Sequence, residues 1–194
     1  MILPIVAYGD PVLRKVGKDI EKDYPNLDDL IINMEETMKN AQGVGLAAPQ
    51  VGRSIRLFLI DAAPFSENEE LDKEERDFLK GFRRTFINAK IVEEEGDEWA
   101  FNEGCLSIPN INEDVYRNET ITVKYVDETF EEKQEVLSGL AARIFQHEYD
   151  HIEGVLFTDH LSTLKKRLLK KKLENISKGK TDVSYRMRFP NIKK

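Results

Sequence analysis

The sequence predicts an α+β fold, in which small antiparallel or mixed sheets pack around one central helix, with a further helix toward each end. Strand-like runs rich in β-branched and aromatic residues fill the middle of the chain, and a helical pattern follows them. The 194 residues, 40% of them hydrophobic, can bury one sizeable core. We therefore expect a main domain at 1–160 and a basic helix and tail at 161–194.

The first predicted element is a helix over about 26–41. Its apolar residues recur at intervals of three and four positions, which places them on one helical face: Leu27, Leu30, Ile31, Met34, Met38 and Ala41. Asn26 can cap the start of this helix, and Gly43 can end it.

Four strand-like runs follow, at 56–61, 85–93, 120–127 and 130–137. A short turn separates the last two, so they predict a hairpin. Between the first two lies a strongly charged insertion at 64–82, which we expect to be a solvated surface loop with a helical turn. The sequence assigns this insertion no role.

The central helix is expected to begin at Ser138 and to end at Gly154. His147 and His151 lie four positions apart on it, which corresponds to about 40° of rotation and roughly 6 Å of rise. Both imidazoles therefore leave the same face, at the spacing by which two nitrogen ligands reach one divalent metal. Glu148 stands beside them in the position of a general base.

The histidine pair leaves more than one interpretation open. A zinc peptidase of the thermolysin type needs a glutamate ligand about twenty residues downstream, where the chain offers only Glu174. His160 lacks the metzincin spacing and is expected to be a surface or cap residue, and Asp150 a structural partner. A chance pair of core or surface histidines is the alternative without function. A third ligand would decide between these interpretations.

Cys105 can supply that ligand. It stands in "NEGCLSIPN" at 102–110, an extended segment that can approach the helix from across the sheet. A thiolate with two imidazoles leaves a fourth tetrahedral position open, as in catalytic zinc sites. Taken alone, Cys105 is more often a buried inert thiol. Because it is the only cysteine, an internal disulfide is excluded and a reducing compartment is favoured.

A third stretch, "GVGLAAPQ" at 43–50, combines glycines that permit close approach of a substrate backbone with the side-chain amide of Gln50. This amide can donate a hydrogen bond to a developing oxyanion. In isolation the stretch is equally typical of a helix end that leads into a tight turn.

Together, "GVGLAAPQ", "EGCLS" and "QHEYDH", in this order, resemble the three signature motifs of the peptide deformylase family. The likeness covers about residues 1–160 and includes "GDPVLRKV" near the N-terminus. It implies a metal-dependent hydrolase that removes the N-terminal formyl group from formyl-methionyl nascent polypeptides and releases formate. The alternatives are a metallopeptidase and an inactive protein that binds peptides or ribosomes, and the filled chemical positions disfavour the inactive protein.

The resemblance also implies a role for each matching residue. The expected metal ligands are Cys105, His147 and His151, and the expected catalytic groups are Glu148 as acid and base, with Gln50 and the N–H of Leu106 as oxyanion contacts. The expected substrate-binding residues are Val44, Gly45, Gly104, Glu103 and Arg143, the first three binding the peptide as an added strand. The implied cofactor is one divalent ion, with Fe²⁺ favoured and Zn²⁺, Ni²⁺ or Co²⁺ as alternatives.

Two polar positions near this site carry further expectations. Arg143 projects from the same helical face as His147, and an unpaired guanidinium beside an apolar pocket is costly. We expect a carboxylate partner, with Glu103 as the first candidate and Asp150 as an alternative. Asn112 stands where certain bacterial members of the family carry arginine, so the substrate preference is expected to differ.

The charge of the chain is divided unevenly. The formal net charge is −7, yet residues 161–194 hold 12 Lys or Arg against Glu174 and Asp182. The tail is expected to form a helix that ends in "SKGKTD" at 177–182, with a basic half left free and an apolar half docked on the body: Leu161, Leu164, Leu168, Leu169, Leu173 and Ile176.

The basic half suggests an anionic partner. Our hypothesis is docking on the RNA surface of the ribosome, and the alternative is intramolecular charge balance. Truncation after about Ser177 is then expected to leave activity on short formyl peptides intact. The N-terminus lacks a signal-peptide pattern, so we expect a bacterial-type cytoplasm. We also expect a monomer, with neither DNA nor a membrane as a partner.

Overall fold

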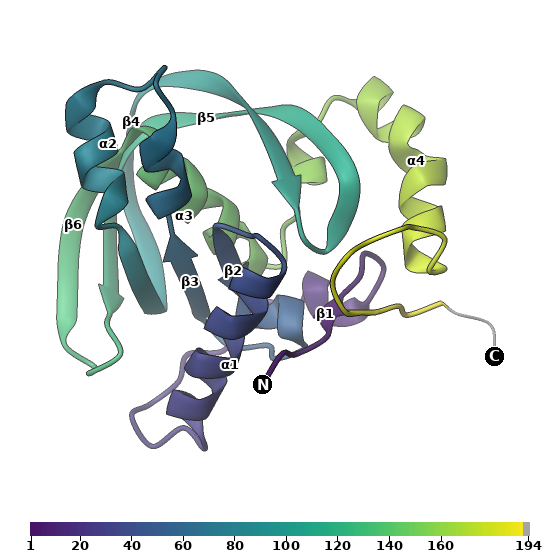
Figure 1. Ribbon diagram of the computed structural model, residues 1–194, viewed down its shortest axis with the longest axis horizontal. Helices are drawn as coiled ribbons and strands as arrows, with labels where there is room; N and C mark the ends of the chain where they lie inside the picture. The colour runs from purple at the N-terminus through teal and green to yellow at the C-terminus, as the bar shows by residue number, and fades with distance from the viewer. Residues whose placement is uncertain (192–194) are drawn as a thin grey trace.

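The computed structural model describes residues 1–191 and confirms the predicted α+β class. One antiparallel sheet has the strand order β2-β3-β4-β5-β6 (Figure 1). A second sheet is a parallel pair of β1 and β7. The strands of the larger sheet are β2 (Gly45–Ala47), β3 (Leu57–Asp61), β4 (Arg83–Cys105), β5 (Ile108–Val126) and β6 (Glu132–Ser138). Because β2 is the first strand in this order, one of its edges is left unpaired.

The strands β4 and β5 are much longer than the sequence predicts. The predicted runs at 85–93 and 120–127 form only the end of this ribbon that lies beside β3 and β6, and the rest continues to a turn after Cys105. Register shifts interrupt the pairing at several places, and such bulges bend a strand pair. The predicted final hairpin is confirmed as β5 and β6, paired from Thr120↔Ser138 to Val126↔Glu132.

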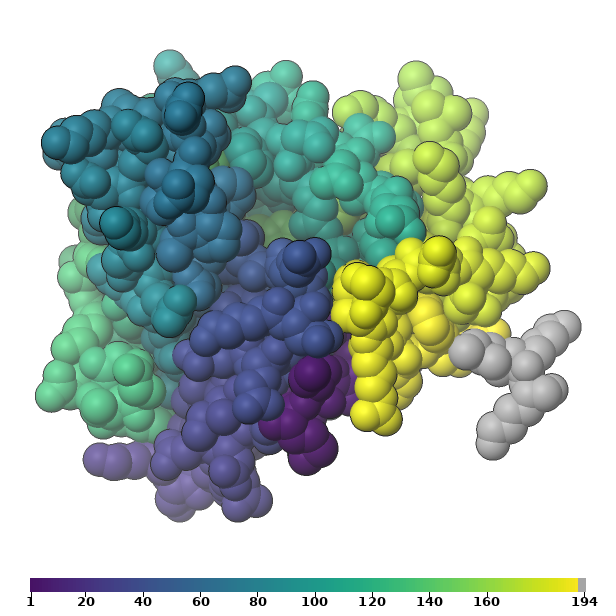
Figure 2. Space-filling view, in the orientation of Figure 1, coloured from purple at the N-terminus to yellow at the C-terminus, as the bar shows by residue number. Residues whose placement is uncertain are grey.

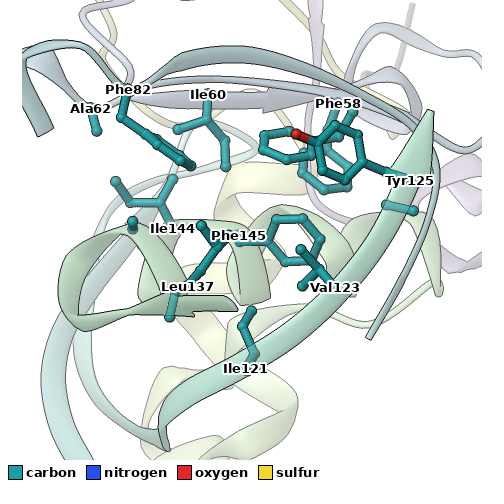
Figure 3. Close-up of a cluster of buried hydrophobic side chains, with 14 of the residues drawn as sticks. Phe58, Ile60, Ala62, Phe82, Ile121, Val123, Tyr125, Leu137, Ile144 and Phe145 are labelled. Atoms are coloured by element: carbon teal, nitrogen blue, oxygen red, sulfur yellow. The ribbon is translucent and has the colours of Figure 1, made fainter. Parts of the chain in front are cut away.

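The predicted central helix is α3 (Gly139–Ile152), which is buried along most of its length. Phe145 packs edge-on against Phe58 and Phe86, with ring centroids 5.1 and 5.0 Å apart, and this contact fixes α3 to the sheet (Figure 3). The helix itself ends at Ile152, and the predicted terminator Gly154 follows two positions later with a φ of 73°. Ser138 occupies the N-cap position, but its side chain makes no capping bond.

The charged insertion is not a solvated loop. It forms a 3-10 turn, η3 (Ala63–Glu67), and a helix, α2 (Lys73–Lys80), and its residues Leu79 and Phe82 are buried in the core under the sheet. The expectation of a solvated loop was wrong in part: most of the charged residues are exposed, as is Phe78 at 46%, but Leu79 and Phe82 face inward. The insertion also has a role: Glu75 Oε1 accepts a hydrogen bond of 2.9 Å from the N–H of Leu140 and so caps α3.

The first helix is α1 (Leu27–Asn40), as predicted, but neither expected cap acts as foreseen. Asn26 lies at the N-cap with a φ of 55° and makes no side-chain capping bond. At the other end Gln42, rather than Gly43, is the left-handed residue, with a φ of 55°. Gly43 instead donates its N–H to Met38 O at 3.0 Å.

The C-terminal helix is α4 (Thr163–Ser177), and Gly179 follows it with a φ of 72°, so its end is where the sequence predicts it. The apolar face by which α4 was predicted to dock on the body includes two residues that the body does not cover. Leu164 and Leu168 are 66% and 70% exposed, because only a narrow stripe of α4 reaches the body. That stripe consists of Leu169, Leu173 and Ile176, and together with Leu161, which precedes the helix, it is buried in one cluster with residues of the N-terminal segment and β5.

The chain then returns to the body. β7 (Met187–Arg188) pairs in parallel with β1 (Ile5–Val6), and in Figure 2 the yellow C-terminal segment lies against the purple N-terminal residues. The sequence did not predict this pair. The remaining short elements are the 3-10 turns η1 (Pro11–Arg14), η2 (Ala48–Val51) and η4 (Phe157–His160). Between residues 1 and 191, no helix is long and apolar enough to cross a membrane.

Candidate metal centre

The three predicted metal ligands lie together. One donor atom each from Cys105, His147 and His151 lies within 4.8 Å of the other two. Cys105 Sγ is 3.3 Å from His151 Nε2, close to the roughly 3.5 Å that ordinary metal–ligand bond lengths give for two donors on one tetrahedral ion. The cysteine comes from the end of β4 and both histidines from one face of α3. This geometry fits a single divalent ion.

The imidazole of His147 has a fixed orientation. Its Nδ1 lies 2.9 Å from Glu103 Oε2, so that Nε2 is left to face the cysteine. Burial alone lowers the pKa of His147, but its hydrogen bonds to Cys105 and Glu103 prevail and raise the pKa well above its ordinary value. Burial raises the pKa of the Cys105 thiol, but the charge of His151 and hydrogen bonds from both imidazoles lower it to about 5. The sulfur is therefore prepared as a thiolate, the form that binds metals.

Glu148 lies beside the three candidate ligands, and its carboxylate is available for proton transfer. The residue is 4% exposed, and no hydrogen bond to its Oε2 is present in the described part of the chain. Burial raises the pKa of Glu148 to about 7, against the lowering effect of the two histidines. Gly45 makes room for this side chain, since a Cβ at that position would overlap the carboxylate. A carboxyl group in this state can take up and release a proton near neutral pH.

Gln50 also lies where the sequence predicts it, against the cysteine. Its side-chain oxygen accepts the N–H of Ala47 at 2.8 Å, which leaves the amide nitrogen facing the site. That nitrogen is 3.3 Å from Ser107 Oγ and 3.5 Å from Cys105 Sγ. Leu106 lies directly after the cysteine, in the turn between β4 and β5. Both expected oxyanion donors are thus adjacent to the ligand group.

A cavity of about 690 Å³ opens onto this group. All five expected substrate-binding residues line it: Val44, Gly45, Glu103, Gly104 and Arg143. Other lining residues were missed by sequence reasoning, namely Phe65 from the insertion, Phe101 from β4 and the C-terminal residues 182–185. No local pattern in those segments indicates a site, because only the fold brings them to it.

The expected pair of Arg143 and Glu103 is present, with Nη1 and Oε1 3.0 Å apart. Arg143 is only 2% exposed, and it also donates to backbone carbonyls. A second arginine, Arg117, was missed: it binds both oxygens of Glu103, at 2.8 and 3.0 Å, and reaches Asp150 at 2.8 Å. Asp150, the expected structural partner, also lies 2.7 Å from the ring of His160, which is exposed at the surface as expected.

The metallopeptidase interpretation receives no support from this arrangement. Among residues 1–191, the group that could hold a metal contains the cysteine and no downstream glutamate. Glu174 instead lies exposed on α4 and pairs with Lys178.

Comparisons with known proteins agree with the motifs. The sequence profile of the polypeptide deformylase family matches residues 2–167. A peptide deformylase from Christiangramia forsetii is 65% identical over 194 residues, which is 100% of this chain and 99% of that protein. One from Flavobacterium johnsoniae is 66% identical over 194 residues, with the same coverage.

The fold is similar to solved structures as well. The crystal structure of a peptide deformylase from Legionella pneumophila superimposes with a TM-score of 0.77 at 38% identity, over 93% of this chain and 98% of that one. For the enzyme from Thermotoga maritima the TM-score is 0.71 at 41% identity, over 84% of this chain and 99% of that one. The likeness therefore extends over nearly the whole of both chains.

Proposed function

The chain belongs to the polypeptide deformylase family, whose members remove the N-terminal formyl group from nascent peptides, and we propose how its own residues perform that reaction. The observation that carries the proposal is the group of Cys105, His147 and His151, which lies beside the buried carboxylate of Glu148 at the wall of an open cavity.

Cys105, His147 and His151 are the proposed ligands of one divalent ion. Thiolate and imidazole suit both iron and zinc, so the preference for Fe²⁺ rests on the family, and Zn²⁺, Ni²⁺ and Co²⁺ remain alternatives. When bound, the ion supplies Lewis acidity, which lets water act as a nucleophile near neutral pH. The closeness of the three donor atoms supports this assignment.

Glu148 is the proposed general base and acid. It accepts a proton from the water that adds to the formyl carbon, and it later returns that proton to the amine nitrogen as the C–N bond breaks. The products are formate and a peptide with a free N-terminus. The burial of Glu148, its raised pKa and its free carboxylate oxygen support this role.

Two donors are proposed to stabilise the formyl oxygen as negative charge develops on it. They are the amide nitrogen of Gln50, already aimed at Cys105, and the N–H of Leu106. Such donors are fixed before the reaction, and the loss of one typically costs about 3 kcal/mol of transition-state stabilisation.

The substrate peptide is proposed to bind as an extra strand along the free edge of β2. Gly45 begins β2, Val44 directly precedes it and Gly104 lies near the end of β4, and all three line the cavity. Glu103 and Arg143 also line the cavity, but their charged groups are bonded within the protein. We propose that these two act on the substrate indirectly, by holding His147.

Formate release tests the proposed function. Protein prepared without oxygen and analysed for metal should release formate from a formyl-Met peptide and leave the matched acetyl-Met peptide intact. Protein with one equivalent of metal that releases no formate would contradict the proposal.

The cellular setting completes the proposal. A bacterial-type cytoplasm agrees with the bacterial relatives and with a reduced thiol as ligand. We propose a monomer that meets its substrate at the ribosome, with the exposed lysines of α4 as the docking surface. The charge of the tail supports this docking, although Lys165 is not free as expected, since it pairs with Glu113 at 2.6 Å.

A further inference from the structure

The segment after α4 forms part of the wall of the substrate cavity. Residues 182–185 line the same cavity as the ligand group, although some thirty positions separate them from His151 in the sequence. The expectation that truncation after Ser177 spares activity therefore no longer holds, because truncation would remove this wall.

The segment is held in place by its own contacts. The side chain of Asn110 donates to the carbonyl of Asp182 at 2.9 Å and to Thr181 Oγ1 at 3.2 Å. Directly after Tyr185, the backbone carbonyl of Arg186 accepts the N–H of Ile5 at 2.9 Å, at the start of the pairing between β1 and β7. Tyr185 is thus anchored from both sides.

Tyr185 contacts the turn that follows the cysteine ligand. Its hydroxyl donates to the carbonyl of Leu106 at 2.8 Å. Burial raises the pKa of Tyr185, so the hydroxyl remains a neutral donor. The next carbonyl in the turn, that of Ser107, accepts the N–H of Tyr8 at 2.8 Å. Both carbonyls of this two-residue turn are therefore held by contacts from outside β4 and β5.

We propose that Tyr185 is a positioning residue for deformylation, which fixes the Leu106 backbone so that the Leu106 N–H points at the developing oxyanion. The inference rests on the oxyanion role proposed for Leu106. A hydrogen bond to the carbonyl holds the peptide group that follows Leu106, and in a two-residue turn this limits how far the preceding peptide group, which carries the Leu106 N–H, can rotate. A donor fixed in advance stabilises the transition state more than the bound substrate. Tyr185 thus affects turnover more than substrate affinity.

The test uses full-length Tyr185→Phe, which removes the hydroxyl and keeps the ring, and Tyr116→Phe as the matched control, because Tyr116 is 63% exposed on β5. We expect kcat of Tyr185→Phe to fall roughly 3- to 10-fold, with KM within about twofold of the wild type. Metal content should match the wild type, and the thermal midpoint should fall by no more than the few degrees that the loss of one hydrogen bond causes. The backbone amide resonance of Leu106 in ¹⁵N-labelled protein should shift, and Tyr116→Phe should change none of these quantities.

Two outcomes would overturn the inference. In the first, Tyr185→Phe turns over like the wild type. In the second, its loss of activity is accompanied by an equal loss of bound metal, or the Leu106 amide resonance does not shift, which indicates a structural role only. Wild-type protein that holds metal and releases no formate would instead contradict the proposed function, so the two failures are distinguishable.

Discussion

The carboxylate of Glu103 lies 2.9 Å from Nδ1 of His147, and this contact connects the strand that ends at Cys105 with the helix that carries His147 and His151. The same carboxylate is bound by the guanidinium groups of Arg117 and Arg143. One buried acid therefore pairs with two buried arginines, of which Arg117 also pairs with Asp150, and it orients the imidazole of His147. It thus contributes both to stability and to the candidate metal site.

Replacement of Glu103 by glutamine should affect both properties. The amide cannot accept from all its present donors, and two buried guanidinium groups lose their shared counter-charge. We expect the free energy of unfolding to fall by about 3 kcal/mol and metal affinity to fall roughly 10- to 100-fold. Urea unfolding and a metal competition titration measure the two effects.

Glu113→Gln is the control for Glu103→Gln, since Glu113 lies on the same ribbon and pairs with a half-exposed lysine. Its free energy of unfolding should change by no more than about 0.5 kcal/mol. Equal losses of unfolding free energy in the two variants would show that the buried ion pairs of Glu103 stabilise the protein no more than a half-exposed pair does.

The second prediction separates metal binding from proton transfer. Glu148→Gln should keep one equivalent of metal and lose turnover roughly 100- to 10,000-fold, because an amide cannot accept the proton of the attacking water. Metal analysis and formate release on the same sample provide the measurement. Near wild-type turnover would contradict the assignment of Glu148 as the general base.

Cys105→Ala is the counterpart of this variant: it should lose the metal first, and it should lose activity as a consequence. Two histidines on one helix hold an ion weakly, so metal should be lost on dialysis, and activity with it. Tight stoichiometric metal in Cys105→Ala would exclude the cysteine from the ligand set.

The sequence predicts a structural feature well when residues close together in the chain determine that feature. The spacing of His147 and His151 is local, because one helix turn fixes it, and the motif around Cys105 indicated the third candidate ligand. The partner of Arg143 was predicted from the cost of leaving a buried guanidinium unpaired. These features needed no knowledge of how distant segments meet.

The features that the sequence missed depend on tertiary contacts. Leu164 and Leu168 share a helical face with buried leucines, but periodicity cannot show how wide a stripe the body will cover. Arg117 and Tyr185 carry no local signal, because their partners are 14 and 79 positions away in the chain. The full length of β4 and β5 was missed as well. Their outer parts are exposed and rich in polar residues, so they lack the apolar pattern by which a strand is predicted from sequence.

The third prediction concerns the insertion that seemed to lack a role. Glu75 caps α3 through the N–H of Leu140, and a carboxylate at a helix N-terminus also interacts favourably with the helix dipole. Glu75→Ala should lower the free energy of unfolding by about 1 kcal/mol. Glu74→Ala, one position away and exposed, is the control and should be close to neutral. Equal urea midpoints for the two variants would contradict the capping role.

The fourth prediction is a dependence of stability on pH at the turn between β5 and β6. Asp127 accepts hydrogen bonds from the Thr129 side chain and from the N–H groups of Thr129 and Glu131, and these lower its pKa to about 2. Because the folded pKa is depressed, the stabilisation is present above about pH 4 and is lost as the pH falls toward about 2.

Asp127→Ala should therefore lower the free energy of unfolding by about 1 kcal/mol near neutral pH, since the turn is partly exposed to solvent. The difference from the wild type should shrink as the pH falls below about 4. Urea unfolding over a pH series measures it, with Asp97→Ala, an exposed carboxylate on β4, as the control. A difference that stays constant with pH would contradict the assignment.

The last prediction concerns the exposed surface of α4. Lys170, Lys171 and Lys172 are exposed on this helix, and no ion pair to them is present in the described part of the chain. If they contact ribosomal RNA, binding should fall steeply with salt, because each contact releases counterions. Charge reversal of all three to glutamate should then abolish cosedimentation with ribosomes at low salt and leave formate release from short peptides unchanged.

Full-length protein is required for this experiment, because truncation would also remove Tyr185 from the cavity wall. Reversal of Lys22, Lys73 and Lys80, three exposed lysines on other surfaces, changes the net charge equally and should leave cosedimentation intact. If wild-type protein does not cosediment, or if both triple variants lose binding alike, α4 is not a docking surface and its charge serves intramolecular balance. The pairing of Lys165 with Glu113 already shows that part of the tail charge is used in this way.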